Sequence, residues 1–445
     1  MQSVLLRMVA CISINVDFKD RLQVQVEKIK KVGTGTAHLV LHMITEEEAD
    51  MMVRNNILAV DIGNSWYKAL VSDGGEMFEY QMPNAIALFD EELYEKPYDD
   101  EDIELEENLI VEIKSSSFVD KREIFYIGKA AAKQRNVSFT SYNNQKTDEV
   151  RTYILLFAMA AYHTLLSNPF DTELEYKVDQ LGVSLPTTQY KENKEQFKER
   201  LIGTHTVIFH KVPGIKEPKE SVVKLTIEDV IVGAEGACAY LGLTRDQDTL
   251  AITNETLVED SLKGIIIGDL GGDSVDFIGI KNNKPVASVE GEAFGINPFL
   301  DVIMQKVSKN ELYQFNSRSE LEEKLAKGQS EWYVEPFAGV KRDISKYIIP
   351  QLRSLAMKYL EHFDRVRSRS SEIKGAARYI AVGGAVDIAQ RQIEEAAIKW
   401  KERGRPIDLY YPEDMANLNV LGLMILAKMN QFRNENIDEF AYTKI

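Results

Sequence analysis

The chain has 445 residues, of which 44% are hydrophobic and 28% are charged. This length is too great for one compact core, so it predicts two folded units of ordinary globular composition. The formal net charge of −17 disfavours direct binding to nucleic acid, because the phosphate backbone repels an acidic surface.

The apolar runs and the cysteines favour a cytoplasmic protein without a membrane segment. No apolar run reaches the length of about 18 residues that a membrane-spanning helix requires. The two cysteines, Cys11 and Cys238, make neither a disulfide framework nor a metal cluster, which suits a reducing compartment.

Residues 1–56 differ in pattern from the rest of the chain, and two interpretations stay open. Short alternating apolar stretches allow strands, so the segment can be a folded extension. It can equally reflect a start codon upstream of the true one, which would then be Met43, Met51 or Met52. We assign this segment no function.

The first regular pattern is a buried strand, a tight turn and a second strand at 57–72, ILAVD-IGNS-WYKALVS. A glycine two residues after the strand-ending aspartate lets the chain bend, and the backbone N–H groups of such a bend attract phosphate. A lysine on the second strand adds a cation within reach of a β- or γ-phosphate. A single turn of this kind is also common in plain hairpins. The candidate residues are Asp61, Gly63, Asn64, Ser65 and Lys68.

The middle of the chain predicts further alternating elements. The acidic segment 90–107 is interpreted as a solvated loop or as a docking surface for a basic partner. A buried helix is predicted over 153–166, a strand over 179–185 and an amphipathic helix over 192–202. The polar, acidic stretch 244–263 marks the candidate boundary between two halves.

Just before that boundary, DVIVGAEGACAYLGL (229–243) predicts a strand, then Glu235, then a helix rich in small residues. A carboxylate at the head of this helix could orient an attacking water. The helix dipole alone also favours a glutamate there, so both interpretations stay open at this point.

The strand–turn–strand pattern returns at 264–280 as GIIIGD-LGGDS-VDFIGI. Two copies of one unit predict a duplicated architecture. If the two turns face each other, they hold a triphosphate from both sides, and Mg²⁺ bound through water relieves the repulsion between the phosphates and the aspartates. The candidate residues of the second turn are Asp269, Gly271, Gly272, Asp273 and Ser274.

A third glycine turn lies in YIAVGGAVDIAQRQI (379–393), where an apolar strand runs into Gly383 and Gly384 before a helix begins. Small residues at this position let a base or a ribose approach the backbone closely. Strand–glycine–helix turns are common in α/β proteins, so this segment indicates a nucleotide site only in combination with the two Asp-x-Gly turns.

In this order, the four segments resemble the ATPase superfamily of actin, sugar kinases and heat-shock chaperones. They are most similar to ParM-type plasmid-segregation actins, because of DLGGDSVD (269–276), EGEAFGINPFLDVI (290–303) and YPEDMANLNVLGLMIL (411–426). The resemblance spans 57–430 and leaves 1–56 uncovered.

The resemblance implies an α/β, two-lobed actin-like fold. Each lobe would be a ribonuclease-H-like mixed sheet with flanking helices, and the nucleotide would lie in the cleft between the lobes. The expected bounds are 57–258 for the first lobe, 259–415 for the second, and 416–445 for a C-terminal helix that packs back on the first lobe. The implied cofactors are ATP and Mg²⁺, with GTP left open.

Residue by residue, the family's two phosphate motifs match the two turns given above. Its water-orienting glutamate matches Glu235. Asp269 is expected to be catalytic by holding the water shell of the metal, with Asp61 acting on the same shell. The sequence departs from the family at Asp273, where a hydroxyl residue is frequent and a carboxylate is less suited to touch phosphate. The adenosine motif matches Gly383, Gly384 and Ala385.

The resemblance further implies an ATPase that polymerises into filaments with nucleotide and drives the segregation of plasmid or other DNA. Its expected partners are further copies of itself and a DNA-binding adaptor, without direct contact to nucleic acid or membrane. Two alternatives stay open. One is a small-molecule kinase of the sugar or acetate type, which would need a catalytic base for which the sequence offers no motif. The other is an actin-like scaffold that is not tied to DNA.

Overall fold

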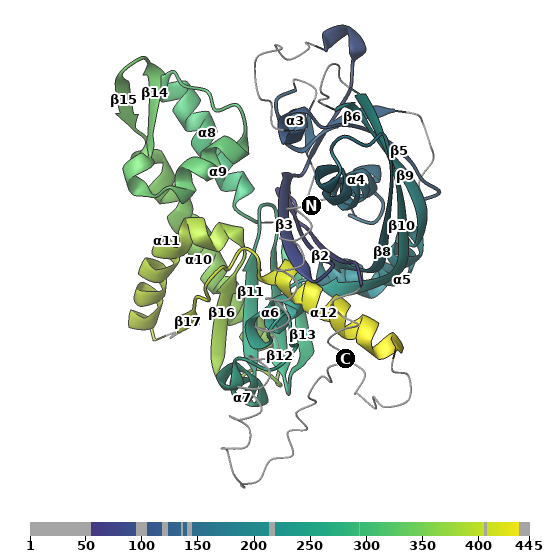
Figure 1. Cartoon of the computed structure of the whole chain (residues 1–445). Helices are drawn as coiled ribbons and strands as arrows, with labels where there is room; N and C mark the ends of the chain where they lie inside the picture. The colour runs from purple at the N-terminus through teal and green to yellow at the C-terminus, as the bar shows by residue number, and fades with distance from the viewer. Residues whose placement is uncertain are drawn as a thin grey trace, which may run out of the picture. The chain divides into compact units, whose positions relative to one another are not determined.

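The structure is a computed structural model of the chain (Figure 1). It describes residues 55–94, 105–117, 123–134, 137–139, 145–212, 219–292, 294–404 and 407–435. The predictions made for residues 1–54, for most of the acidic segment and for 436–445 lie outside the described residues. None of the helices in the described ranges combines the length and apolar character that crossing a bilayer demands.

The first half of the described chain is a mixed sheet curled around one helix, α4 (Val150–Ser167) (Figure 1). The curled sheet faces α4 on several sides, and 14 of the 18 residues of the helix are buried. Its apolar character on all sides fits this position. In spatial order the strands are β3 (Glu76–Pro83), β2 (Trp66–Asp73), β1 (Ile57–Ile62), β8 (Glu173–Leu185), β10 (Lys219–Ala234), β9 (Gly203–Val212), β5 (Ile110–Lys114), β6 (Ile124–Ile127), β4 (Ala85–Leu88) and β7 (Ser138–Phe139).

The second half is a smaller mixed sheet with helices on both faces. Side chains alternate along its strands, so Ile266 and Leu270 join the core of one face while Ile265 and Ile267 join the other. Its strands in spatial order are β13 (Lys284–Glu292), β12 (Val275–Lys281), β11 (Ile265–Leu270), β16 (Arg378–Val382) and β17 (Leu409–Tyr410). The first face packs against α10 (Ser345–Arg369) and α11 (Gly384–Glu402), the second against α6 (Ala237–Thr244) and α7 (Glu255–Lys263).

The remaining described elements are short or peripheral to the two sheets. A two-stranded sheet of β14 and β15 stands apart from the larger sheets, next to α8 and α9 (Figure 1). The bounds are α3 (Gly128–Ala132), α5 (Thr187–Leu201), α8 (Asn297–Glu311), α9 (Arg318–Ala326), β14 (Tyr333–Phe337), β15 (Val340–Asp343) and the 3₁₀ turns η1 (Glu91–Leu93), η2 (Leu105–Asn108) and η3 (Gln329–Glu331).

The C-terminal helix α12 (Leu418–Glu435) returns to the first half of the chain and packs on β1, β8 and β10. It also crosses α6 at very short range. A Cβ atom added to Gly422 would lie 1.7 Å from the carbonyl oxygen of Cys238, so only glycine allows the two helices to approach this closely. The thiol of Cys238 is buried in this contact.

The structure confirms that the predicted strand–turn–strand unit occurs twice. β1 pairs antiparallel with β2, and β11 pairs antiparallel with β12, each pair around an Asp-x-Gly turn. The register places Asp61 opposite Lys68 in the first hairpin and Asp269 opposite Asp276 in the second. The two hairpins therefore place different charges at equivalent positions.

Other predicted elements are found with changed bounds. The helix expected over 153–166 is α4, and the helix expected over 192–202 is α5, which starts earlier. β8 extends the strand predicted over 179–185 toward the N-terminus, because its early residues pair with β10. The polar stretch 244–263, expected as a boundary, contains α7, whose buried Leu257 packs beneath the second sheet.

Candidate functional site

A cavity of about 320 Å³ lies where the three glycine turns meet. Of the fourteen residues predicted for the site, thirteen line it, and they come from both halves of the described chain. They are Asp61, Gly63, Asn64, Ser65, Lys68, Glu235, Asp269, Gly271, Gly272, Ser274, Gly383, Gly384 and Ala385. Asp273 does not line the cavity, and its carboxylate instead accepts a hydrogen bond of 2.9 Å from the Asn297 amide.

The first turn is held from behind by Asn84. Its side-chain amide donates to the Gly63 carbonyl and its backbone N–H donates to the Ser65 carbonyl, both at 2.8 Å. The Ser184 hydroxyl donates to Asp61 at 2.9 Å from the neighbouring strand β8. These bonds fix the turn, and they hold the Asp61 carboxylate in place near the end of β1.

The second turn is fixed by the start of α8, and it faces the first turn. The backbone N–H groups of Ile296 and Asn297 donate to the carbonyls of Gly271 and Gly272 at 3.1 and 2.7 Å. A Cβ atom at Gly272 would lie 2.4 Å from the Ser65 hydroxyl oxygen. The two turns are therefore opposed and in close contact at this point.

The third turn closes the cavity beside the second hairpin. Gly383 precedes the first residue of α11 and has φ = +99°, a conformation that side chains of L-residues rarely adopt. Its N–H donates to the Met415 carbonyl at 3.0 Å. A Cβ atom at this position would lie 2.4 Å from Asp269 Oδ1 and from the Leu270 carbonyl oxygen.

Glu235 follows β10, is buried, and lines the cavity next to Lys146, a residue that was not predicted from the sequence. The Lys146 ammonium donates to Glu235 Oε1 at 2.7 Å and to the Ile62 carbonyl at 2.5 Å. Burial raises the pKa of the Glu235 carboxyl, and the Lys146 charge opposes this rise. Burial lowers the pKa of Lys146, but the Glu235 carboxylate outweighs it and leaves that pKa raised.

The cavity carries a surplus of negative charge. Burial, together with Glu235 and Asp61, raises the pKa of Asp269 to about 7. Burial, together with Glu235 and Asp269, raises the pKa of Asp276 to about 8. The Asn419 amide, from the start of α12, donates to Asp269 and partly offsets the rise. A bound cation would relieve the crowding of these carboxylates.

This crowding predicts a pH-dependent stability. Because the folded-state pKa of Asp276 lies above its ordinary value of 3.8, the contribution of this carboxyl to the free energy of unfolding falls as the pH rises from about 4 to about 8. Asp276→Asn removes the cost of ionisation, and we expect it to raise the free energy of unfolding at pH 8 by at least about 1 kcal/mol. Urea unfolding of both nucleotide-free proteins at pH 5 and pH 8 measures this difference. Equal losses in wild type and variant between the two pH values would contradict it.

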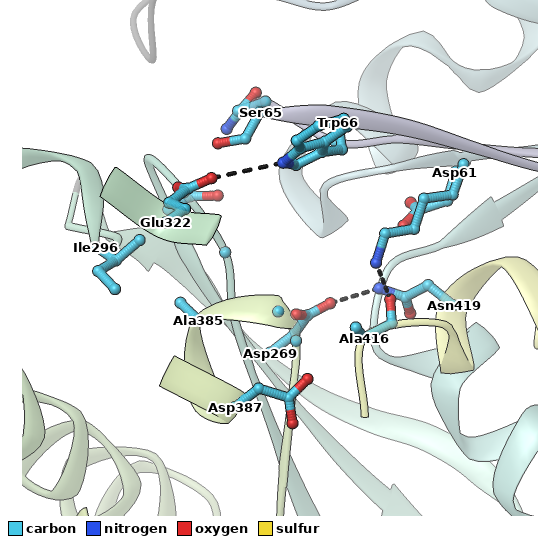
Figure 2. Close-up of a pocket in the computed structure, with 18 of the residues that line it drawn as sticks. Asp61, Ser65, Trp66, Asp269, Ile296, Glu322, Ala385, Asp387, Ala416 and Asn419 are labelled. Atoms are coloured by element: carbon cyan, nitrogen blue, oxygen red, sulfur yellow. Dashed lines mark hydrogen bonds between the residues drawn. The ribbon is translucent and has the colours of Figure 1, made fainter. Parts of the chain in front are cut away.

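One side-chain contact crosses the cavity between the two halves. Figure 2 shows Trp66, from β2, and Glu322, from α9, pointing toward each other, with Trp66 Nε1 donating to Glu322 Oε2 at 3.5 Å. Burial raises the pKa of Glu322 to about 7. On another wall, the Lys68 ammonium donates to the Ala416 carbonyl, just before α12.

Twelve further residues line the cavity that were not among the predicted ones, and four of them carry the polar contacts and charges described above: Asp276, Asn419, Lys146 and Glu322. Asp276 and Asn419 lie inside segments that carried the family resemblance, and superposing the two hairpins would have singled out Asp276. Lys146 and Glu322 lie in polar stretches with no pattern that distinguishes them from surface residues. Only tertiary packing brings these two to the cavity.

Two family models match consecutive parts of the chain. The model of the N-terminal domain of actin-like proteins matches residues 59–237, and the model of the Alp7A C-terminal domain matches residues 264–405. Together they cover well over half of the sequence. The chain therefore belongs to the actin-like proteins. Within them, its second half is of the Alp7A type.

Solved structures support the same fold. The actin-like protein Alp7A is similar over 87% of this chain and 100% of its own, with 20% identity and a TM-score of 0.65. Bacillus thuringiensis ParM with ATP covers 85% of this chain and 99% of its own, with 20% identity and a TM-score of 0.59. The archaeal actin homologue Ta0583 is similar over 84% of this chain and 99% of its own, with 19% identity and a TM-score of 0.58. The predicted two-lobed actin-like fold is confirmed. No curated protein matches the sequence at a significant level.

Proposed function

We propose that the chain is an actin-like ATPase that polymerises into filaments with nucleotide and segregates plasmid or other DNA through a DNA-bound adaptor. The observation that carries the proposal is the pair of opposed hairpin turns, which touch at Ser65 and Gly272 and place Asp61 and Asp269 on one cavity. The similar structures include Bacillus thuringiensis ParM with ADP, with AMPPNP and with ATP, which supports a nucleotide as the ligand.

In this proposal the phosphates lie between the two turns and accept hydrogen bonds from the turn N–H groups. The Lys68 ammonium adds charge from the first hairpin, and the ribose and base approach the backbone at Gly383 and Gly384. A site with so many carboxylates needs a cation to hold a triphosphate. Mg²⁺ fits, because it binds through water and one or two carboxylates plus substrate phosphates.

Asp61 and Asp269 would hold the water shell of Mg²⁺, and the ion would neutralise charge that develops on the phosphate oxygens. The described residues contain no group of three His, Cys, Asp or Glu side chains arranged to hold a metal by themselves. This arrangement agrees with an ion that arrives with the nucleotide.

Hydrolysis requires a positioned water more than covalent help from the protein. The Glu235 carboxylate would accept a hydrogen bond from the attacking water and align its oxygen with the γ-phosphorus, while the bond to the β–γ bridging oxygen breaks. Contacts of the γ-phosphate with both turns favour closure of the two halves, and their loss after hydrolysis weakens it.

Closed subunits would add head to tail, and heterologous contacts that do not close on themselves give filaments. The acidic net charge of −17 agrees with an indirect route to DNA through a basic adaptor.

The test uses the wild-type chain with ATP, ADP and AMPPNP. We expect sedimentable filaments by electron microscopy with ATP and AMPPNP, fewer with ADP, and phosphate release from ATP without any added acceptor. Binding of the filaments to DNA only in the presence of a basic partner would support the adaptor. Phosphate transfer to a sugar or acetate without polymer would show instead that the chain is a kinase.

A further inference from the structure

Lys146 is a buried cation whose role is not explained by the phosphate motifs. Only 6% of its surface is exposed, yet it lines the cavity. Its ammonium joins two parts of the site, because it donates to Glu235 Oε1 at 2.7 Å and to the carbonyl of Ile62 at 2.5 Å, one residue before the Gly63 turn.

The backbone around Lys146 is itself anchored. The Lys146 N–H donates to the side chain of Gln189 on α5 at 2.9 Å. The carbonyl of Thr147 accepts from the Tyr153 hydroxyl at 2.6 Å and from the Arg200 guanidinium at 2.8 Å. Two helices therefore hold this segment from behind, so the ammonium reaches the cavity from a fixed base.

The geometry divides the two oxygens of Glu235 between different tasks. Oε1 accepts from Lys146, whereas Oε2 has no hydrogen-bond partner among the described residues. The carboxylate lines the cavity, so its second oxygen is available to a water there. A carboxylate held at one oxygen cannot rotate freely, and this restraint presents the other oxygen in a constant direction.

A role in stability alone explains this ion pair poorly. Taking two charges out of water costs several kcal/mol per ion, and replacing a buried pair by apolar residues is often neutral or stabilising. A buried pair that joins the proposed water-orienting residue to a phosphate turn is better explained by orientation.

We infer that Lys146 is a positioning residue for hydrolysis, which fixes the Glu235 carboxylate relative to the phosphate-1 turn so that Oε2 meets the attacking water. The inference rests on the proposed function, and in particular on the proposed role of Glu235. Misplacement of a catalytic group by about 1 Å can cost about 10²-fold in rate, which sets the effect expected when Lys146 is removed.

The test is a double-mutant cycle of Lys146→Met and Glu235→Gln, with the affinity for a fluorescent ATP analogue and the rate of phosphate release measured separately. We expect Lys146→Met to lower kcat by about 10²-fold and to change the affinity by less than about threefold. The double variant should release phosphate as slowly as Glu235→Gln alone, because Lys146 acts through Glu235. Lys146→Arg, which keeps the charge, should recover at least tenfold of the lost rate.

The matched control is Lys198→Met, which removes a lysine of the same half that pairs with Asp229 at 2.6 Å outside the cavity. It should keep the wild-type kcat.

Three results would overturn the inference: an unchanged kcat in Lys146→Met, a loss confined to affinity, or a fold-reduction of kcat in the double variant equal to the product of the two single fold-reductions. If Lys146→Met does not fold, the phosphate-release rate of the double variant is compared with that of Glu235→Gln instead, because the double variant buries no unpaired carboxylate. A clearly lower rate in the double variant would overturn the inference. Absence of hydrolysis in the wild type would instead refute the proposed function itself.

Discussion

Glu235→Gln is expected to slow phosphate release by about 10²–10⁴-fold, the range that a positioned acid–base group contributes, while polymerisation with ATP persists. The substitution replaces the carboxylate by a carboxamide, whose oxygen can still accept the hydrogen bond from Lys146. The surrounding structure is therefore retained. What disappears is the negative charge that attracts and aligns the proton-bearing water. Filaments should therefore outlast those of the wild type, because their nucleotide stays unhydrolysed.

Light scattering and a phosphate-release assay on the same sample separate the two effects. The control is Glu199→Gln, the same chemical change at an exposed position on α5, which should behave as wild type. Phosphate release at the wild-type rate in Glu235→Gln would refute the role of this residue. Loss of both polymer and nucleotide binding would show instead that the residue supports the cavity.

Local chemistry explains why the sequence alone predicts the three turns. A strand-ending aspartate followed by glycine specifies a turn within a few residues, and the register of a hairpin then determines that Lys68 lies opposite Asp61. The same rule applied to the second hairpin gives Asp276 opposite Asp269. That step requires only the two sequences side by side, so Asp276 was predictable.

Long-range packing supplies the rest of the site. Lys146 reaches Glu235 only because α4 and α5 hold its backbone, and Glu322 meets Trp66 from the other half of the chain. Neither contact leaves a periodic trace in the sequence. Asp273 shows the opposite case, because its place in the turn predicted a binding residue, but Asn297 from the next helix draws its carboxylate away from the cavity.

Gly383→Ala is expected to have the largest effect on stability and to abolish nucleotide binding. The backbone at φ = +99° is strained for alanine, at a cost of order 1–3 kcal/mol. The added methyl group would also lie 2.4 Å from Asp269 Oδ1 and from a backbone oxygen of β11, which cannot rotate away. The turn must therefore move out from the second hairpin, and the cavity loses the wall where the ribose is expected.

The next residue provides the matched control, because a Cβ atom at Gly384 would meet nothing within 4 Å and its backbone is helical. Thermal unfolding should give Gly384→Ala a melting temperature close to that of the wild type, whereas Gly383→Ala should melt several degrees lower, since about 1 kcal/mol shifts the melting temperature of a large domain by roughly 2–4 °C. Comparing the two variants separates the effect of steric crowding at Gly383 from the effect of replacing any glycine by alanine. Equal melting temperatures for the two variants would mean that the third turn does not pack on Asp269 as the structure shows.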